Sequence, residues 1–362
     1  GDHRDLHSFP TRRSSDLFFH ARLWDAETPS IQNGVLDLAQ RPEERAFELS
    51  GQWEFYWGQA LTEAQIKSGG HGFSLVSVPD KWNNYRMNGN ALPGKGTATY
   101  HIHVTGAEAD KQYGVRIQRM ASAYRLTVDG VLIAQNGSFG DDETAPVSAY
   151  RPQLAAFSPT SDNFDLVIQV SNSIYGEGGM WDPIIFGTYP QVAAFDRLLS
   201  NAVTSAMSCL VISCLFFLIF FAVQRKEKDT LILFILGFLV FLRLSLVGDA
   251  VFMSLFPQAP IVYMNWIDFL TMPWAQFFLL YFIHCTYGRI VPKWQVRTVL
   301  AYTAGVTGFI LLFPLDLVTA SYMLMNYILL LVMLAVTAQL IRAAWYGREG
   351  ASLLLSATLL IL

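Results

Sequence analysis

Eight residues that could recognise a small polar ligand lie in segments rich in glycine, proline and asparagine, where we expect loops or strand ends. They are Trp82, Asn83, Tyr85, Arg86, Tyr150, Arg151, Asn172 and Trp181. Planar side chains stack on the apolar face of a pyranose, whereas amide and guanidinium groups hydrogen-bond its hydroxyls. These residue types therefore predict a small-molecule ligand and are compatible with a carbohydrate, but they do not identify the ligand.

Several of these residues also have a structural interpretation, which the sequence leaves open. Trp82 could pack in the interior, and Arg151 and Trp181 could close loops through hydrogen bonds. Asn172 ends an expected strand, where an asparagine side chain often satisfies backbone groups instead of a ligand.

Two patterns resemble metal sites, and neither is complete. His101 and His103 share one face of an expected strand, but no third ligand accompanies them, so we expect solvated histidines. The sequence GDDET (140–144) offers three carboxylates without the spacing of an EF-hand. We therefore predict no metal site and no cofactor.

No nucleophile elbow, phosphate loop or paired glycosidase carboxylates can be recognised, so we expect no catalytic residues and no enzymatic activity in this part of the protein.

Two charged residues interrupt long apolar runs. Arg243 and Asp268 each lie six or seven residues from the same end of consecutive apolar segments, a depth of about 10 Å for a helix. An intramembrane ion pair between them would cancel two desolvation costs. The alternative is that Arg243 extends to the interface and Asp268 faces water.

These side chains belong to two halves of unlike composition. Residues 1–198 contain 16 basic and 23 acidic residues, a net charge of −7, whereas residues 199–362 contain 9 and 6, a net charge of +3. The acidic first half argues against a nucleic-acid partner. The second half has so few charges for its length that we predict a lipid bilayer as its surroundings.

The first half predicts an antiparallel sandwich of the jelly-roll type over residues 47–190. The expected strands lie within 47–57, 97–104, 113–118, 124–137 and 164–172, with a hairpin turn at Asp129-Gly130 and one competing helical stretch at 61–67. Trp53, Phe55 and Trp57 alternate along the first strand, so we assign them to the core.

The second half predicts a multi-helix transmembrane bundle. The expected spans are 199–223, 230–248, 261–283, 298–315 and 317–341, followed by an incomplete sixth at 351–362. Every second connector is basic: eight Lys and Arg lie in 225–229, 284–297 and 342–349, and none lies in the alternate connectors. The positive-inside rule then places the sandwich outside and predicts a multi-pass membrane protein.

Both ends of the sequence differ from the sandwich and the complete helices between them. Residues 1–17 match one reading frame of a short-read sequencing adapter, so we interpret them as non-native. Residues 18–46 could be a signal-peptide remnant or a lead-in. The final run, 351–362, would span about 18 Å as a helix, short of a hydrocarbon core of about 30 Å, so we expect the chain to stop inside a helix.

Several blocks carry a resemblance to known proteins: LSGQWEFYWG (49–58), VPDKW (78–82), GKGTATYHIHV (94–104), YRLTVDGVLIAQNG (124–137), DLVIQVSN (165–172) and GGMWDPIIFG (178–187). In this order they resemble the galactose-binding-like jelly roll of family 2 glycoside hydrolases, where the tryptophan matching Trp82 is mainly structural. Together with LILFILGFLVFLRLSLVGD (231–249), they resemble the bacterial seven-transmembrane receptors with diverse intracellular signalling modules.

That resemblance covers about residues 30–362 and implies a location in a bacterial inner membrane. It also implies a ligand-sensing sandwich, a seven-helix relay and a cytoplasmic output such as a histidine kinase or diguanylate cyclase. The output module is not in this sequence, so its type cannot be read. Two other functions stay open: a membrane-tethered carbohydrate-binding module, and a transporter with an extracytoplasmic cap. A homodimer is also left open. Because only QVAAFDRLLS (191–200) separates sandwich from membrane, we expect a stiff, helical connection.

Overall fold

The structure is a computed structural model. It describes residues 30–39, 45–118, 120, 123–139, 147–149, 151–225, 228–247, 251–256, 260–286, 290–347 and 355. Four of the features predicted above therefore lie outside the described residues: the segment 1–17, GDDET (140–144), Tyr150 and, apart from Leu355, the sixth span.

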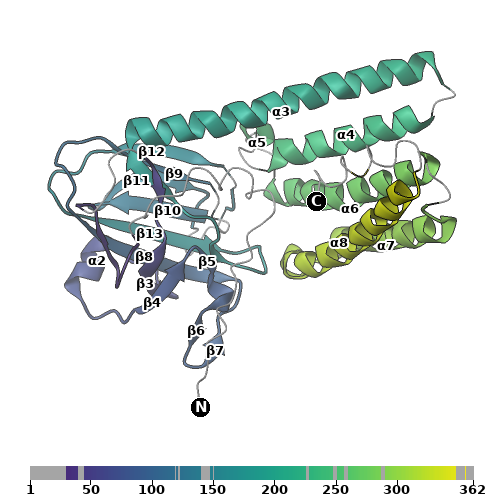
Figure 1. Cartoon of the computed structure of the whole chain (residues 1–362). Helices are drawn as coiled ribbons and strands as arrows, with labels where there is room; N and C mark the ends of the chain where they lie inside the picture. Colours follow the sequence, from purple (N-terminus) through teal and green to yellow (C-terminus); the bar gives the residue numbers. More distant parts are fainter. Residues whose placement is uncertain are drawn as a thin grey trace.

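The first half folds as a β-sandwich whose larger sheet has the order β11-β10-β13-β8-β3-β4, with β1 also paired to β8 (Figure 1). Its strands are β1 (Val35–Asp37), β3 (Gly51–Trp57), β4 (Ser74–Val78), β8 (Gly96–Thr105), β10 (Ala123–Val128), β11 (Val131–Asn136) and β13 (Phe164–Asn172). The predicted turn joins β10 to β11: Asp129 and Gly130 have φ of 48° and 76°, as a two-residue hairpin turn of type I′ requires.

The smaller sheet covers one face of the larger one and has the order β12-β9-β15-β2. Its strands are β2 (Phe47–Glu48), β9 (Tyr113–Ile117), β12 (Gln153–Phe157) and β15 (Ile185–Thr188). Phe164 of the larger sheet and Phe186 of the smaller one meet with ring centroids 6.5 Å apart. Trp53 and Phe55 are fully buried in the same core, as their alternation predicts. Two short ladders, β5 (Asp80–Lys81) with β14 (Gly179–Met180) and β6 (Arg86–Met87) with β7 (Asn90–Ala91), complete the strands.

The sandwich includes part of the segment that the sequence assigns to a lead-in. Ile31 and Leu36 are 1% and 0% exposed, and β1 pairs in parallel with β8, Val35 opposite His103. A strand of three residues is too short to show a periodic pattern, so its place in the sheet could not be predicted. The helix considered at 61–67 is present as α2 (Glu63–Ser68).

Among the described residues, five helices are long and apolar enough to cross a membrane. They are α3 (Tyr189–Val223), α4 (Lys228–Leu246), α6 (Ile261–Thr286), α7 (Lys293–Leu312) and α8 (Leu315–Trp345), with a short α5 (Val251–Leu255) between α4 and α6. They correspond to the five full spans predicted, except that α3 begins ten residues before position 199. Five is fewer than the seven that the family resemblance implies.

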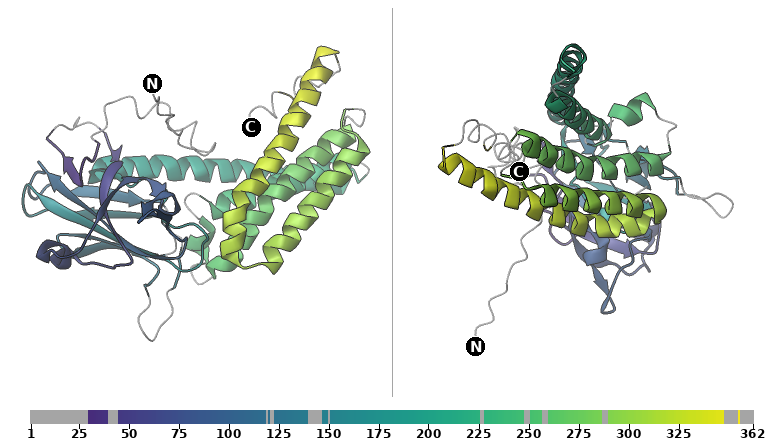
Figure 2. Two further views of the ribbon diagram at one scale, coloured as in Figure 1. Left: turned by 90° about the horizontal axis from the view of Figure 1, so that it is seen from below. Right: turned by 90° about the vertical axis from the view of Figure 1, so that its right-hand side faces the viewer.

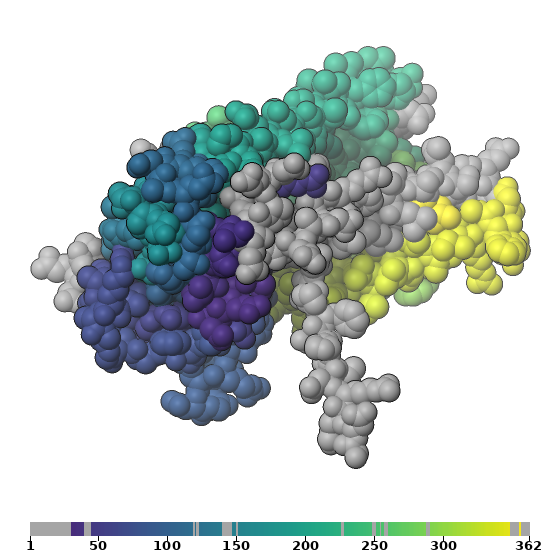
Figure 3. Space-filling model, turned by 60° about the vertical axis from the view of Figure 1, so that its left-hand side comes forward, coloured from purple at the N-terminus to yellow at the C-terminus, as the bar shows by residue number. Residues whose placement is uncertain are grey.

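The sandwich lies at one end of the helices, which run away from it side by side (Figures 1 and 2). The space-filling view shows α3 in teal along one edge of the molecule and the yellow end of α8 far from the sandwich (Figure 3). Because α3 starts at the sandwich, the ends at Arg225 and Lys228 are the distant ones, and the helix order places Lys293 and Arg342 there too.

Candidate functional site

Three of the predicted ligand residues, Trp82, Asn83 and Asn172, lie together at the end of the sandwich that faces the helices. They surround residues 173–178, which we call the docking loop, and the neighbouring turn at Gly94. Trp82 and Asn172 are 0% and 2% exposed. The structure therefore favours a role in shaping these loops over direct contact with a ligand.

Asn172 uses its whole side chain on backbone groups. Its Nδ2 donates to the carbonyl oxygens of Gly94, Tyr175 and Glu177 at 2.8, 2.9 and 3.0 Å. Its Oδ1 accepts from the backbone N–H groups of Ile174 and Tyr175 at 3.3 and 3.0 Å. An amide whose donors and acceptor are all engaged has little left to offer a ligand.

Trp82 and Asn83 begin the short helix η1 (Trp82–Asn84) and hold the same loops from the other side. Trp82 Nε1 donates to the carbonyl oxygen of Gly94 at 3.0 Å. Asn83 Oδ1 accepts from the N–H of Gly178 at 2.9 Å, and its Nδ2 donates to the carbonyl oxygen of Gly176 at 3.3 Å. Together with Asn172 these bonds define the path of the docking loop.

The other predicted ligand residues do not share one location. Tyr85 is 9% exposed and its hydroxyl donates to the carbonyl oxygen of Ser77 at 2.7 Å. Arg86 is exposed and bonds within its own hairpin, and Arg151 is exposed. Trp181 packs edge-on against Tyr175 with ring centroids 5.5 Å apart, so it supports the docking loop.

The docking loop contacts the helices through polar groups. The N–H of Gly176 donates to Thr319 Oγ1 of α8 at 2.8 Å. Asn265 Nδ2 of α6 donates to the Tyr175 hydroxyl at 3.0 Å. From the adjacent turn, Lys95 Nζ lies 2.5 Å from Asp316 Oδ2 at the start of α8. Sandwich and helices are therefore joined by side chains as well as by the chain itself.

The covalent connection is the helix α3, which starts directly after β15. Its first turns pack on the smaller sheet, where Val192 and Ala193 are buried. Gly114 of β9 permits this close approach, since a Cβ there would lie 3.1 Å from Tyr189 Cα. Arg116 Nε of β9 then donates to Asp196 Oδ1 at 2.7 Å, with the arginine side chain 2% exposed.

Within the helices, Arg243 Nη1 of α4 donates to Asp268 Oδ1 of α6 at 2.8 Å, the pairing that the sequence predicts. Arg243 Nη1 also donates to the carbonyl oxygen of Asp268 at 3.3 Å. The pair lies between the two helices at the end nearer the sandwich. It can hold α4 against α6 where the bilayer offers no other partner for either charge.

A second charged group occupies the outer face of the larger sheet, away from the smaller one. His101 Nδ1 lies 2.7 Å from Glu54 Oε2, and His101 Nε2 lies 2.9 Å from Asp165 Oδ1. Burial lowers the pKa of His101, but hydrogen bonds to Asp165 and Glu54 outweigh burial and raise the pKa to about 9. The expectation of solvated histidines is wrong for His101, which is 8% exposed and carries a positive charge at neutral pH.

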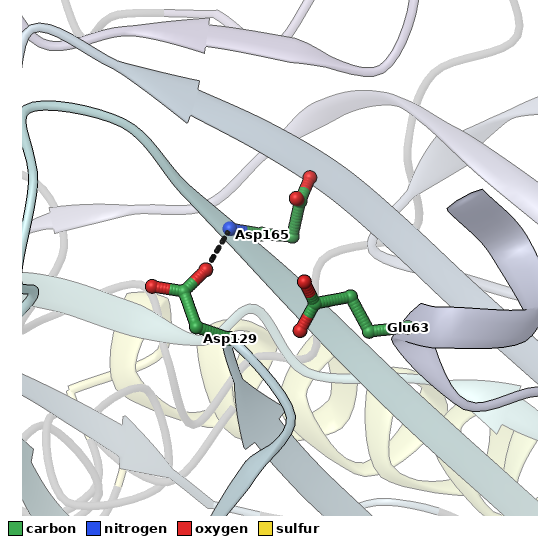
Figure 4. Close-up of side chains that lie close together, drawn as sticks. All are labelled: Glu63, Asp129 and Asp165. Carbon is green, nitrogen blue, oxygen red and sulfur yellow. Dashed lines mark hydrogen bonds between the residues drawn. The ribbon is translucent and has the colours of Figure 1, made fainter.

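Three carboxylates meet beside this histidine: Glu63 of α2, Asp129 of the hairpin turn and Asp165 of β13 (Figure 4). Their oxygens lie within 4.8 Å of one another, which is close enough for a shared cation. Lys67 already supplies the positive charge, since its Nζ lies 2.8 Å from Asp165 Oδ2 and also pairs with Glu63. The geometry therefore gives an internal ion network and does not by itself indicate a metal site.

Sequence reasoning missed the residues that join the two halves. Arg116 is a charge in an otherwise apolar strand, and Lys95 stands between two glycines. Asp316 is the only charge in a three-residue connector. Isolated charges of this kind were the available signal, but their partners are 80 and 221 residues away, and no local pattern identifies them.

No family model matches this chain, and no curated protein matches it. Solved structures similar to it include a GH2 β-galacturonidase from Eisenbergiella tayi, with 17% identity and a TM-score of 0.29 over 39% of this chain and 24% of the enzyme. Another is a β-glucuronidase from Faecalibacterium prausnitzii, with 15% identity and a TM-score of 0.32 over 41% and 32%. The chain thus spans about a quarter to a third of the length of these enzymes. The identities and TM-scores are too low to support a functional argument.

Proposed function

We propose that the chain is the sensory part of a bacterial membrane receptor. A galactose-binding-like sandwich outside the inner membrane binds a small ligand, and the helices relay that event to a cytoplasmic output module such as a histidine kinase or diguanylate cyclase. The observation that carries this proposal is the unbroken helix from the sandwich into the membrane half.

The helix α3 is suited to transmit motion. Its 35 residues extend about 52 Å, well beyond a hydrocarbon core of about 30 Å. The excess packs against β9 and β15, and the Arg116–Asp196 pair fixes it there. A displacement of the last strand would therefore move the whole helix, whereas a flexible tether would absorb it.

The proposed orientation follows from charge. Arg225, Lys228, Lys293 and Arg342 lie at the helix ends away from the sandwich. The positive-inside rule places those ends in the cytoplasm and the sandwich outside.

The two alternative functions have less support. A tethered binding module needs one helix and no side-chain contacts to a bundle. Transporters commonly have helices broken near mid-membrane. Here α6 contains Pro273 but stays helical over 26 residues, and in the described part of the chain the other four long helices are likewise continuous.

Carbohydrate is proposed as the ligand class from the sequence resemblance alone. The whole chain in nanodiscs would be melted in the presence of a panel of neutral sugars and uronic acids. We expect at least one compound to raise the melting temperature through binding to the folded state. A panel without any effect would exclude these sugars as ligands.

The relay is tested at the far end of the helices. Spin labels at Val223 and Trp345, which are 78% and 87% exposed, would report the distance between the ends of α3 and α8 after Cys209, Cys214 and Cys285 are replaced by serine. The stabilising sugar should change this distance. A distance that stays constant while the sugar binds would overturn the relay.

A matched pair of variants isolates the helix. Residues 198–201 would be replaced by four glycines or by four alanines, because glycine lowers helix stability by about 1 kcal/mol per residue relative to alanine. The alanine variant should keep the sugar-induced distance change. The glycine variant should still bind the sugar but lose that change.

A further inference from the structure

In the described part of the chain, the sandwich is attached to the helices at two places of different character. The attachment through α3 is covalent and buried, with Val192 0% exposed and Arg116 held by Asp196. The attachment through the docking loop and the adjacent turn at Gly94 is non-covalent and polar, and the Lys95–Asp316 pair in it has side chains 51% and 34% exposed. Exposed ion pairs contribute little to stability and weaken with salt. Of the two attachments, only the second can open while the fold stays intact.

The docking loop is built to move as one piece. Asn172 and Asn83 fix its backbone from inside the sandwich, and Lys81 Nζ lies 2.5 Å from Glu177 Oε2. The loop therefore keeps its shape whether or not it touches the helices. Its outer contacts, Gly176 to Thr319 and Tyr175 to Asn265, would break or form together.

The contacted residues lie directly above the intramembrane ion pair. Asn265 precedes Asp268 by three residues on α6, and Thr319 precedes Tyr322 by three on α8, so each couple shares a helix face. Tyr322 packs on Phe269 of α6, next to Asp268 in the sequence, with ring centroids 4.4 Å apart. The docking loop thus contacts the same faces of α6 and α8 that meet beside the ion pair.

We propose that the docking loop is a releasable clamp: in one state it holds the outer ends of α6 and α8 against the sandwich, and in the other it lets them go while α3 stays attached. The signalling role of this clamp rests on the receptor function proposed above. The existence and opening of the clamp do not, and they can be tested without a ligand.

Gly176 offers a selective way to open it. A Cβ at this position would lie 2.2 Å from the carbonyl oxygen of Asp316 and 3.0 Å from Ala320 Cβ, both on α8. Gly176 does not have a left-handed φ, so the sandwich itself can accept alanine there. Gly176→Ala should therefore block docking without damaging the loop. Gly72→Ala is the matched control, because Gly72 has no left-handed φ either and its Cβ would meet nothing within 4 Å.

The readout is carbodiimide crosslinking of the whole chain in nanodiscs, with the crosslinked peptides quantified by mass spectrometry. The Lys95–Asp316 product reports docking, and the Lys81–Glu177 product, formed inside the sandwich, serves as the reference. We expect Gly176→Ala to lower the Lys95–Asp316 product at least fivefold relative to the reference and Gly72→Ala to leave the ratio unchanged. In the wild-type chain, raising the salt concentration from 0.05 to 0.5 M should also lower the ratio.

Hydrogen exchange separates a clamp from a mere contact. In Gly176→Ala, peptides covering 261–272 and 315–326 should exchange faster, while peptides from β8 and β13 stay unchanged. A crosslink ratio insensitive to Gly176→Ala, or unchanged exchange in those helix ends, would overturn the clamp. A sugar that changes the Val223–Trp345 distance equally in Gly176→Ala and wild type would support the receptor and overturn the signalling role of the clamp.

Discussion

The two halves of the protein direct their apolar side chains in opposite ways. In the sandwich, both sheets point them inward, and Trp53, Tyr100 and Phe164 are at most 1% exposed. In the helices most point outward: 6% of the membrane-spanning window of α3 is buried within the protein, and 33% in α6 and α7. The sandwich therefore has a core of its own, whereas the helices depend on the bilayer to cover them.

This difference shows where each half can change shape. A close-packed core resists rearrangement, because any shift opens voids or forces strained side chains. Helices that face lipid lose little when they slide past one another, and a few polar contacts decide their positions. We expect substitutions in the sandwich to change stability and substitutions between the helices to change arrangement.

The largest effect is expected for Asn172→Ala in the sandwich. This change removes five hydrogen bonds to buried and partly buried backbone groups and should lower the free energy of unfolding by about 4 kcal/mol. Urea unfolding followed by tryptophan fluorescence measures it, with the exposed Asn163→Ala as control. A loss below about 1 kcal/mol would contradict the structural role and return Asn172 to the candidates for ligand contact.

Next is the pH dependence of sandwich stability, which His101 should dominate on the alkaline side. Its pKa is about 9 in the folded state and 6.5 in the reference state, so its stabilisation is complete below pH 6.5 and disappears as the pH rises to 9. The shift corresponds to about 3 kcal/mol. Urea unfolding at pH 6 and pH 9 should show this loss for wild type and little of it for His101→Gln. An equal loss of unfolding free energy in wild type and His101→Gln would show that His101 is not the group responsible for the pH dependence.

A smaller effect is expected at the joint between the halves. Asp196→Ala leaves the buried guanidinium of Arg116 without its carboxylate, although Gln118 Oε1 still accepts from Arg116 Nη1 at 3.0 Å. We expect a loss of about 2 kcal/mol, below the usual range for a broken buried pair because Asp196 is partly exposed. The neighbouring exposed residue provides the control, Arg197→Ala, which should be neutral. Equal melting temperatures for the two variants would argue against the pair as an anchor.

The smallest effect is expected between the helices. Arg243→Met and Asp268→Leu each leave one charged side chain without its oppositely charged partner, whereas the double variant removes both charges. The double variant should therefore be more stable than either single variant. A double-mutant cycle in detergent should give a coupling energy of about 1 kcal/mol. Additive single effects would show that Arg243 and Asp268 act independently, as if each faced water.

The sequence predicts the strands and helices in which apolar residues follow a regular pattern. Alternation in 164–172 gives β13 with its observed ends, and apolar runs give the five long helices of the described chain. Residue type in loops predicts less, because Trp and Asn serve backbone closure and ligand binding equally well. Trp82 and Asn172 illustrate this, since only the positions of Gly94 and Tyr175 show which role the structure favours.

Long-range pairs could not be predicted, except where depth in the bilayer constrained them. Arg243 and Asp268 lie at equal depth in neighbouring spans, which is enough to predict their pairing. For Arg116 and Asp196 the sequence contains no comparable constraint on their relative positions. The fold brings the two side chains together, whereas the sequence shows each only as an isolated charge.

The unequal helix lengths have a consequence for the surrounding lipid. Of the five long helices, the shortest are α4 and α7, with 19 and 20 residues and lengths of about 28 and 30 Å, whereas α3 extends about 52 Å. The hydrocarbon core of a thicker bilayer would still be shorter than α3 but longer than α4 and α7. The bilayer must then become thinner around these two helices, or the helices must reduce their tilt. Because Arg243 sits on one of these short helices, bilayer thickness itself becomes a variable that acts on the intramembrane ion pair.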